Sequence, residues 1–173
     1  MSDQSLRRLV TARPATGLDA PVIAEIWYAG WRDGHEGNVP DELVAVRTHE
    51  SFRSRAAERI EDTVVAIVDG DVAGFVMVVG AEIEQVYVAR AHRGTGVASV
   101  LLAEGERIVA ADGFEQAWLA VVAGNARARR FYERSGWSDD GLIDYSVASA
   151  GEPISIPAHR YAKRVSARDD AAV

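Results

Sequence analysis

A short glycine-containing turn, Arg93-Gly94-Thr95-Gly96-Val97-Ala98, joins a strand-like segment to a helix-like one. The preceding residues 83–88 are rich in β-branched and aromatic side chains, which is typical of a strand. The following residues 97–109 carry apolar or small side chains at helical spacing. A turn that opens directly onto a helix presents free backbone N–H groups at the positive end of the helix dipole. The sequence therefore predicts an anion site suited to phosphate, to which Arg93 adds a full positive charge.

The spacing of this turn differs from that of two common phosphate-binding loops. A Walker loop has a Lys after its second glycine, and no Lys follows Gly96. A dinucleotide-binding fingerprint has a third glycine where this chain has Ser99, and an acidic residue at the end of the next strand. The next strand-like run, near residues 116–122, is followed by Ala-Gly-Asn. The pattern that remains is Arg-x-x-Gly-x-Ala at the start of a long helix.

Length and composition narrow the class of protein. The 173 residues suit one domain with a full core, and we expect a single domain over residues 1–173. The chain has no cysteine, which excludes disulfides, a thiol nucleophile and Cys-based metal sites. The net charge of -7 argues against nucleic acid as a partner; it is compatible with a cationic amine substrate, although acidity also simply aids solubility. Because we find no signal-peptide pattern and no apolar run that could span a membrane, we expect no membrane partner and a cytoplasmic location.

Periodicity and turn residues predict an ordered series of helices and strands. Asp19 is a plausible N-cap of the first helix, Asp69-Gly70 is a hairpin signal, and Asn125 is a plausible N-cap of a short helix. We expect residues 166–173 to form a disordered tail. The predicted strands cover residues 6–12, 63–68, 72–79, 83–88, 117–122, a region from 137, and 154–165, and the predicted helices cover 19–31, 41–60, 97–111 and 125–134. This order indicates an α+β fold around a mixed sheet.

Two segments resemble the signatures of one enzyme family. Arg93-x-x-Gly-x-Ala98 resembles motif A of the GCN5-related N-acetyltransferase (GNAT) family, Gln/Arg-x-x-Gly-x-Gly/Ala, which holds the pyrophosphate of acetyl-CoA. Asn125-x-x-Ala-x-x-Phe-Tyr-Glu-Arg-x-Gly-Trp137 is similar to the family's second signature, Asn-x-x-Ala-x-x-Phe-Tyr-x-x-x-Gly-Phe/Trp. The two lie in the family's order, and residues 31–37 and 40–43 are more loosely similar to a segment of bacterial members.

The resemblance implies a fold and a cofactor site. The fold would be a mixed, mostly antiparallel sheet of about six to seven strands flanked by about four helices. Backbone N–H groups of the turn would take the pyrophosphate, the end of the strand at Val86 to Val88 would pair with the pantetheine arm, and the N–H of Val88 could stabilise the oxyanion. Asn125 would lie near the pantetheine, which is compatible with its role as a helix cap. The residues assigned to the cofactor are Val86, Tyr87, Val88, Arg93, Gly94, Thr95, Gly96, Val97, Ala98, Ser99, Asn125 and Tyr132.

The same resemblance suggests catalytic residues. Tyr132 matches the family's usual general acid, and a phenol with a pKa near 10 can protonate a departing thiolate of similar basicity. The other interpretation of Tyr132 is an aromatic core residue. Glu84 is the candidate general base, acting through a water, with Val86 and Val88 on its face of the strand if alternation holds. Glu82 is a competitor, because a bulge would change which carboxylate points inward.

The acceptor site is expected beside the loop that follows the first helix. His35 and Glu36 lie in that loop, and Trp31, with its aromatic neighbours Trp27 and Tyr28, would form a wall of the pocket or part of the core. His35 is either a substrate contact or base, or a surface residue. The histidines have no partner at metal-ligand spacing, so we expect no metal. Of the three arginines at positions 127, 129 and 130, which are otherwise solvated, one could reach the phosphate of the adenosine.

These residues lead to one main hypothesis for function. The chain is expected to be an acetyl-CoA-dependent N-acetyltransferase that transfers an acetyl group to a primary amine, of a small molecule or a peptide, by direct attack. A non-catalytic acetyl-CoA-binding sensor or interaction module of the same fold is the alternative. A phosphate-binding regulator outside the family is a third hypothesis. The family often forms homodimers, so a homodimer is a further expectation.

Overall fold

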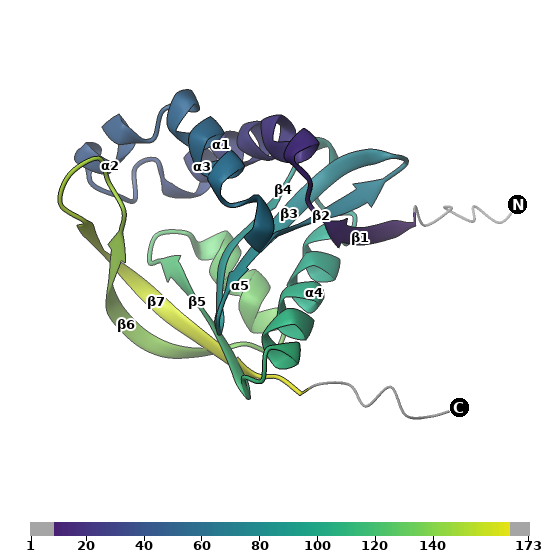
Figure 1. Ribbon diagram of the computed structural model, residues 1–173. Helices are drawn as coiled ribbons and strands as arrows, with labels where there is room; N and C mark the ends of the chain where they lie inside the picture. Colours follow the sequence, from purple (N-terminus) through teal and green to yellow (C-terminus); the bar gives the residue numbers. More distant parts are fainter. Residues whose placement is uncertain (1–8, 167–173) are drawn as a thin grey trace, which may run out of the picture.

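Seven strands form one sheet in the computed structural model, which describes residues 9–166 (Figure 1). Their order across the sheet is β1-β2-β3-β4-β5-β7-β6. Every neighbouring pair is antiparallel except β4 and β5, which are parallel. The α+β fold with a mixed, mostly antiparallel sheet is therefore confirmed. The strands are β1 (Val10–Pro14), β2 (Thr63–Val68), β3 (Asp71–Val79), β4 (Glu82–Val88), β5 (Gln116–Val122), β6 (Ser138–Val147) and β7 (Ile154–Arg164).

Helices cover both faces of this sheet (Figure 1). On one face lie α1 (Ala20–His35), α2 (Asp41–Val46) and α3 (His49–Glu58). On the other lie α4 (Val97–Ala111) and α5 (Ala126–Arg134). Three short 3-10 turns, η1 (Gly17–Asp19), η2 (Ile60–Asp62) and η3 (Arg90–His92), complete the elements of the described residues.

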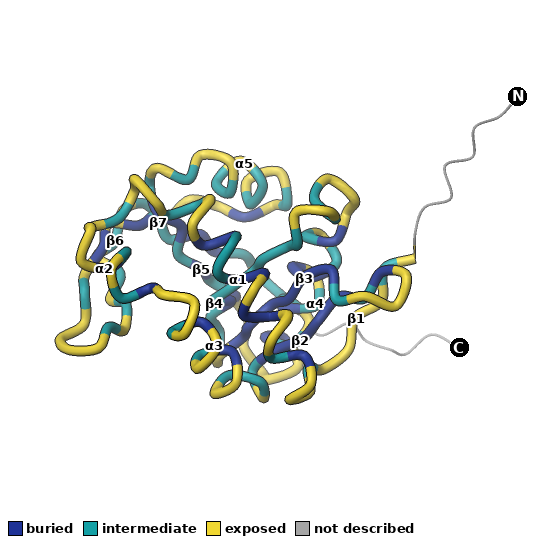
Figure 2. The backbone as a smooth tube through the Cα atoms, turned by 90° about the horizontal axis from the view of Figure 1, so that it is seen from above, coloured by how far each residue is buried: buried dark blue, intermediate teal, exposed yellow. Residues whose placement is uncertain are grey.

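The core has two parts because alternate side chains of the strands point to opposite faces. Beneath α4, Val76 and Ile83 pack with Leu101. Beneath α1 and α3, Trp27 packs edge-on against Phe52 and Phe75, with ring centroids 5.3 Å and 5.8 Å apart. Most residues of β2 and β3 are buried and are drawn dark blue in Figure 2. Phe75 and Val76 are each fully buried, one under each helical layer.

The predicted helical region over residues 41–60 is interrupted at Arg47 and Thr48. Arg47 leaves the helical conformation with ψ 62°, and Thr48 caps α3 by accepting the N–H of Ser51 at 3.2 Å. A Thr whose side chain accepts the N–H of the residue three positions later is a standard N-cap. The first strand is observed from Val10, and the predicted residues 6–8 and the predicted tail beyond 166 lie outside the described residues.

A bulge in β4 changes which way Glu84 points. Met77 pairs with Gln85 and Val78 with Ile83, so Glu84 has no opposite residue. Ile83 and Val86 consequently both pack toward α4, which regular alternation would not allow. Glu84 instead lies on the side of α1 and α3, where its carboxylate forms an ion pair with Arg59. The expected shared face of Glu84 with Val86 and Val88 is thus lost at the bulge.

The parallel strands β4 and β5 separate soon after they meet. In the described residues their pairing consists of Glu82 opposite Trp118, with the N–H of Trp118 donating to the carbonyl of Ala81 at 3.0 Å. Beyond this point, within residues 9–166, the backbone groups at the facing edges of β4 and β5 have no partner in a neighbouring strand. The gap opens toward the C-terminal ends of both strands and is where the site described below lies. No helix among residues 9–166 has the length and apolar character needed to cross a membrane.

Candidate functional site

The turn before α4 has the conformation expected of an anion loop. Gly94 and Gly96 have φ values of 75° and 89°, in the left-handed region that glycine adopts without strain. Gly96 is the N-cap of α4, which begins at Val97. The first N–H groups of this 15-residue helix have no acceptor within the helix. The loop can therefore offer a set of backbone donors to an anion.

This loop borders a groove of about 540 Å³ between β4, α1 and α5. The groove is lined by the predicted cofactor residues Val86, Tyr87, Val88, Arg93, Gly94, Gly96, Ala98, Ser99, Asn125 and Tyr132. Thr95 and Val97 are not part of its lining. The hydroxyl of Thr95 donates to the carbonyl of His92, and the side chain of Val97 is buried in the core. Of the predicted arginines, Arg127 lines the groove, whereas Arg129 is bound to Tyr161 and Asp139.

Asp33 of α1 holds the arginines of the loop region. One carboxylate oxygen lies 2.9 Å from Nη1 of Arg93, and the other lies 2.9 Å from Nη2 of Arg90. Desolvation raises the pKa of Asp33, but hydrogen bonds and charges from Arg90 and Arg93 outweigh it, so the pKa lies below its ordinary value. Asp33 also lines the groove. The carboxylate of Asp33 is thus paired with Arg93 at the position where a phosphate is expected to bind.

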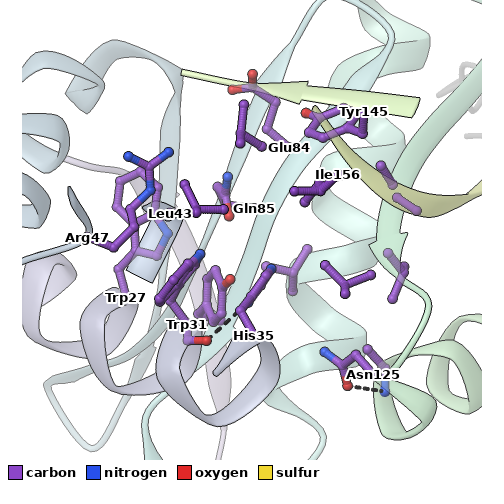
Figure 3. Close-up of a pocket in the computed structure, with 18 of the residues that line it drawn as sticks. Trp27, Trp31, His35, Leu43, Arg47, Glu84, Gln85, Asn125, Tyr145 and Ile156 are labelled. Carbon is purple, nitrogen blue, oxygen red and sulfur yellow. Dashed lines mark hydrogen bonds between the residues drawn. The ribbon is translucent and has the colours of Figure 1, made fainter. Parts of the chain in front are cut away.

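A smaller cavity of about 130 Å³ adjoins the groove on the side of α1 and β7. In Figure 3, Arg47, Trp27, Trp31 and His35 lie on one side of it and Tyr145 and Ile156 on the other. The groove and the cavity share the lining residues Val86, Tyr87, Asn125, Ala128 and Tyr132. A molecule in the cavity would therefore meet a molecule in the groove at these side chains.

Tyr132 lies at this junction. Its ring contacts Trp137 and Tyr161 at centroid distances of 6.2 Å and 6.1 Å, which fix the orientation of the ring. Burial raises the pKa of its phenol above the ordinary value of 10.0. No hydrogen bond joins the hydroxyl to any side chain or backbone group of the described chain. The phenol is thus a neutral donor available to a ligand.

Two glycines of α1 let this helix approach the site closely. A Cβ at Gly30 would lie 2.4 Å from Cδ1 of Tyr87, and a Cβ at Gly34 would lie 2.8 Å from Nδ2 of Asn125. Asn125 itself caps α5, because its Oδ1 accepts the N–H of Ala128 at 3.2 Å. Both predicted roles of Asn125, cap and groove residue, are therefore compatible with its position.

The two candidate carboxylates on β4 have different environments. Glu84 lines the cavity and pairs with Arg59, which also binds Asp62 at 2.9 Å. Glu82 does not line the cavity and accepts a hydrogen bond from the hydroxyl of Tyr145. Burial raises the pKa of Glu82, and the hydrogen bond from Tyr145 only partly offsets this effect. Of these two carboxylates, Glu84 is the one that lines the cavity.

The predicted acceptor residues His35 and Glu36 also differ, and His35 is the last residue of α1 instead of part of the loop after it. His35 lines the cavity with its ring stacked on Trp31, at 5.1 Å between centroids, and its Nδ1 lies 3.0 Å from the carbonyl oxygen of Trp31. Burial lowers the pKa of His35 to about 4; the hydrogen bond to Trp31 opposes this shift and the charge of Arg47 adds to it. Glu36 points elsewhere, since it is exposed, pairs with Arg32 at 2.9 Å and lines neither space.

Several site residues are absent from the predictions made on sequence. Arg47, Arg55, Gln85 and Tyr145 line the cavity, and Asp33 lines the groove. The Thr48 cap signal could have placed Arg47 at a helix end, but the others carry no local signal because distant segments bring them together. Among residues 9–166, no three His, Asp or Glu side chains are grouped so that they could hold a metal ion.

Comparisons with known proteins agree with this geometry. An uncharacterized N-acetyltransferase of Mycobacterium tuberculosis is 31% identical over 122 residues, covering 65% of this chain and 78% of that protein. A GCN5-related N-acetyltransferase from Rhodopseudomonas palustris has the same fold, with a TM-score of 0.69 and 22% identity over 90% of this chain and 95% of that one. PaiA N-acetyltransferase from Thermoplasma acidophilum, solved in complex with coenzyme A, aligns with a TM-score of 0.66 and 16% identity over 90% and 99% of the two chains. The model of the acetyltransferase (GNAT) family matches residues 24–137, and the chain therefore belongs to this family.

Proposed function

We propose that this protein transfers the acetyl group of acetyl-CoA directly to a primary amine. The observation that carries the proposal is the junction at Tyr132, where a groove that begins at an anion loop meets a separate cavity. The groove would bind acetyl-CoA and the cavity would bind the amine. The left-handed glycines and the first turn of α4 fit the pyrophosphate, and Arg93 and Arg127 add positive charge along the groove.

The end of β4 offers the backbone N–H of Val88 to the thioester arm, while the carbonyl of Val88 accepts a hydrogen bond from Nε of Arg93 at 3.4 Å. The N–H of Ala89 donates to the carbonyl of Ala73 on β3 at 2.8 Å. Because successive N–H groups of a strand point to opposite edges, the N–H of Val88 is directed toward the gap left by β5. A donor there could stabilise the oxyanion that develops on the thioester carbonyl.

In the reaction the amine must lose a proton and the departing thiolate must gain one. The amine nitrogen forms a C–N bond with the acetyl carbon, the C–S bond breaks, and the thiolate of CoA leaves and takes up a proton. We propose that Glu84 accepts the proton of the amine through a water and that Tyr132 protonates the thiolate. These roles are supported by the position of Glu84 on the cavity and by the Tyr132 hydroxyl, which has no hydrogen-bond partner in the described part of the chain.

The acceptor is a small-molecule or peptide amine in this proposal, with Trp31 and His35 among its contacts and Glu36 outside the site. We treat the chain as one domain over residues 1–173. The homodimer and the cytoplasmic location stay predictions.

An acetylation assay tests this function. Purified protein is incubated with acetyl-CoA and a panel of amines, and acetylated products are detected by mass spectrometry. We expect transfer to at least one class of amine, with release of one free CoA thiol per product. If acetyl-CoA binds but no amine in the panel is acetylated, the hypothesis of a non-catalytic acetyl-CoA sensor replaces that of an enzyme.

A further inference from the structure

Two arginines border the small cavity and have no carboxylate partner among residues 9–166. Arg47 is only 8% exposed, and its Nη2 donates to the backbone carbonyl of Ala148 at 2.6 Å. Arg55 lies over the indole of Trp27, with Cζ 4.4 Å from the ring centroid. Its guanidinium forms no hydrogen bond or ion pair with the described part of the chain. A sequestered cation is costly unless an anion or acceptor meets it, so this part of the cavity favours negative charge.

Other groups around the same cavity are donors as well. The indole Nε1 of Trp27 is fully buried and has no hydrogen-bond partner among the described residues. The hydroxyl of Tyr87 also has no partner there, and the charges of Arg47 and Arg55 both act on it. A buried donor without an acceptor destabilises a fold unless a ligand or water satisfies it. The Tyr87 hydroxyl and the two arginines can donate hydrogen bonds to a ligand in the cavity, whereas Nε1 of Trp27 is enclosed by protein.

The carboxylate of Glu84 does not neutralise Arg47 and Arg55. Glu84 lines the cavity, but its ion-pair partner is Arg59. The pKa of Arg55 is lowered to about 10, mainly by burial and next by the charge of Arg47, while Tyr87 and, least of all, Glu84 oppose the shift. Burial also lowers the pKa of His35, so this ring brings no charge at neutral pH. The side of the cavity formed by Arg47, Arg55 and Trp27 is therefore positive, although the whole chain carries a net charge of -7.

We propose that the acceptor amine also carries an oxyanion, such as a carboxylate, and that Arg47 and Arg55 bind it. This inference rests on the proposed function, because it places the acceptor in the cavity. An arginine fork suits the two oxygens of a carboxylate or a related oxyacid group. The cavity of about 130 Å³ suits a compact molecule of amino-acid size. With its anion at Arg47 and Arg55, the amine of such a molecule can extend toward Tyr132 and Val86, where the C–N bond forms and the C–S bond breaks.

The experiment compares pairs of acceptors that differ in one charge. Free L-amino acids and their carboxamides are tested as acceptors of the acetyl group, with the wild-type protein, Arg55→Gln and Arg53→Gln. Arg53 is the control because it lies on the same helix but is exposed and outside the cavity. We expect kcat/KM for the best amino acid to exceed that for its carboxamide at least tenfold. Arg55→Gln should remove about tenfold or more of kcat/KM for the acid and little for the amide, because it removes a charge-assisted hydrogen bond. Arg53→Gln should match the wild type.

Calorimetric binding of acetyl-CoA to each variant distinguishes failure of the proposed function from failure of the anionic-acceptor proposal. If acetyl-CoA does not bind to the wild type, the proposed function fails. If it binds and the carboxamides or polyamines are acetylated as fast as the acids, with no effect of Arg55→Gln, only the anionic acceptor is wrong. If Arg55→Gln instead impairs use of succinyl-CoA with neutral amines, the arginines bind an anionic acyl group and the proposal is overturned. Arg55→Lys, which keeps the charge, should retain part of the preference for acids.

Discussion

Asp33 and Arg93 form an ion pair across the mouth of the groove, with 2.9 Å between Oδ2 and Nη1. Asp33 comes from α1 and Arg93 from the loop before α4, so the pair joins the two walls of the groove. An incoming phosphate must share Arg93 with this carboxylate or displace it. Both side chains are partly exposed, so the pair itself is worth at most about 1 kcal/mol.

Replacement of Asp33 should therefore tighten the binding of acetyl-CoA. In Asp33→Asn the groove loses a negative charge and Arg93 loses its competing partner, and we expect an affinity about two- to fivefold higher, by calorimetry. Glu36→Gln is the matched control, since Glu36 is a paired carboxylate on the turn that follows α1 but lies outside the groove. Weaker binding by Asp33→Asn would show that Asp33 positions Arg93 instead of competing for it.

Loss of the Tyr132 hydroxyl should slow the chemical step. Tyr132→Phe keeps the ring and its packing, so we expect kcat to fall about 100-fold with little change in the affinity for acetyl-CoA. Because burial raises the pKa of Tyr132, its deprotonation should not reduce the rate as pH rises to the phenol's ordinary value of 10.0. Tyr28→Phe is the control, because Tyr28 borders neither space. Steady-state kinetics that show an unchanged kcat for Tyr132→Phe would leave Tyr132 as a packing residue.

The buried His35 should make the protein less stable in acid. Its pKa is about 4 in the folded state and 6.5 in an ordinary environment, so between these values the unfolded chain binds a proton that the folded chain does not. The free energy of unfolding therefore falls as pH drops from 6.5 toward 4, by roughly 1–3 kcal/mol from this group. Urea unfolding at several pH values should show a weaker acid dependence in His35→Gln. In His49→Gln, a change at a half-exposed side chain, the wild-type dependence should persist; an equal dependence in His35→Gln and the wild type would refute the assignment.

Gly30 should be required for the contact between α1 and β4. Alanine usually stabilises a helix by about 1 kcal/mol relative to glycine. At Gly30 the new methyl group would lie 2.4 Å from the ring of Tyr87, so we expect a net loss of roughly 1–3 kcal/mol. Gly17→Ala, where a methyl group meets no atom within 4 Å, should change stability little. Thermal unfolding decides the matter, and a Gly30→Ala protein as stable as Gly17→Ala would mean that Tyr87 moves aside freely.

The parts of the fold that could be predicted are those specified by neighbouring residues. Asp69 and Gly70 form the expected hairpin, and Asn125 caps α5 as its sequence indicates. The glycine turn before α4 has the left-handed backbone that its composition suggests. All three depend on contacts within a few positions, which propensity and capping describe well.

The parts that could not be predicted depend on contacts between distant segments. The bulge at Glu84 arises from the register between β3 and β4, and a shift of one position reverses the face of a side chain. Arg47 reaches Ala148, which is 101 positions away, and Arg55 reaches Trp27 on another helix. Apart from the Thr48 cap signal beside Arg47, nothing in the local sequence distinguishes these arginines from the exposed Arg53. The cavity that they border follows from tertiary packing.

The most direct test of the central claim, that the loop from Arg93 to Ser99 holds acetyl-CoA, is a calorimetric titration. Acetyl-CoA, CoA, ATP and NAD are titrated separately into the wild-type protein and Arg93→Ala. We expect micromolar binding of acetyl-CoA and CoA, much weaker binding of ATP and NAD, and about tenfold weaker binding of acetyl-CoA by Arg93→Ala, which loses a charge-assisted contact to phosphate. Equal binding of all four ligands, or no binding of acetyl-CoA, would contradict the claim and leave the glycine loop as a turn without a ligand.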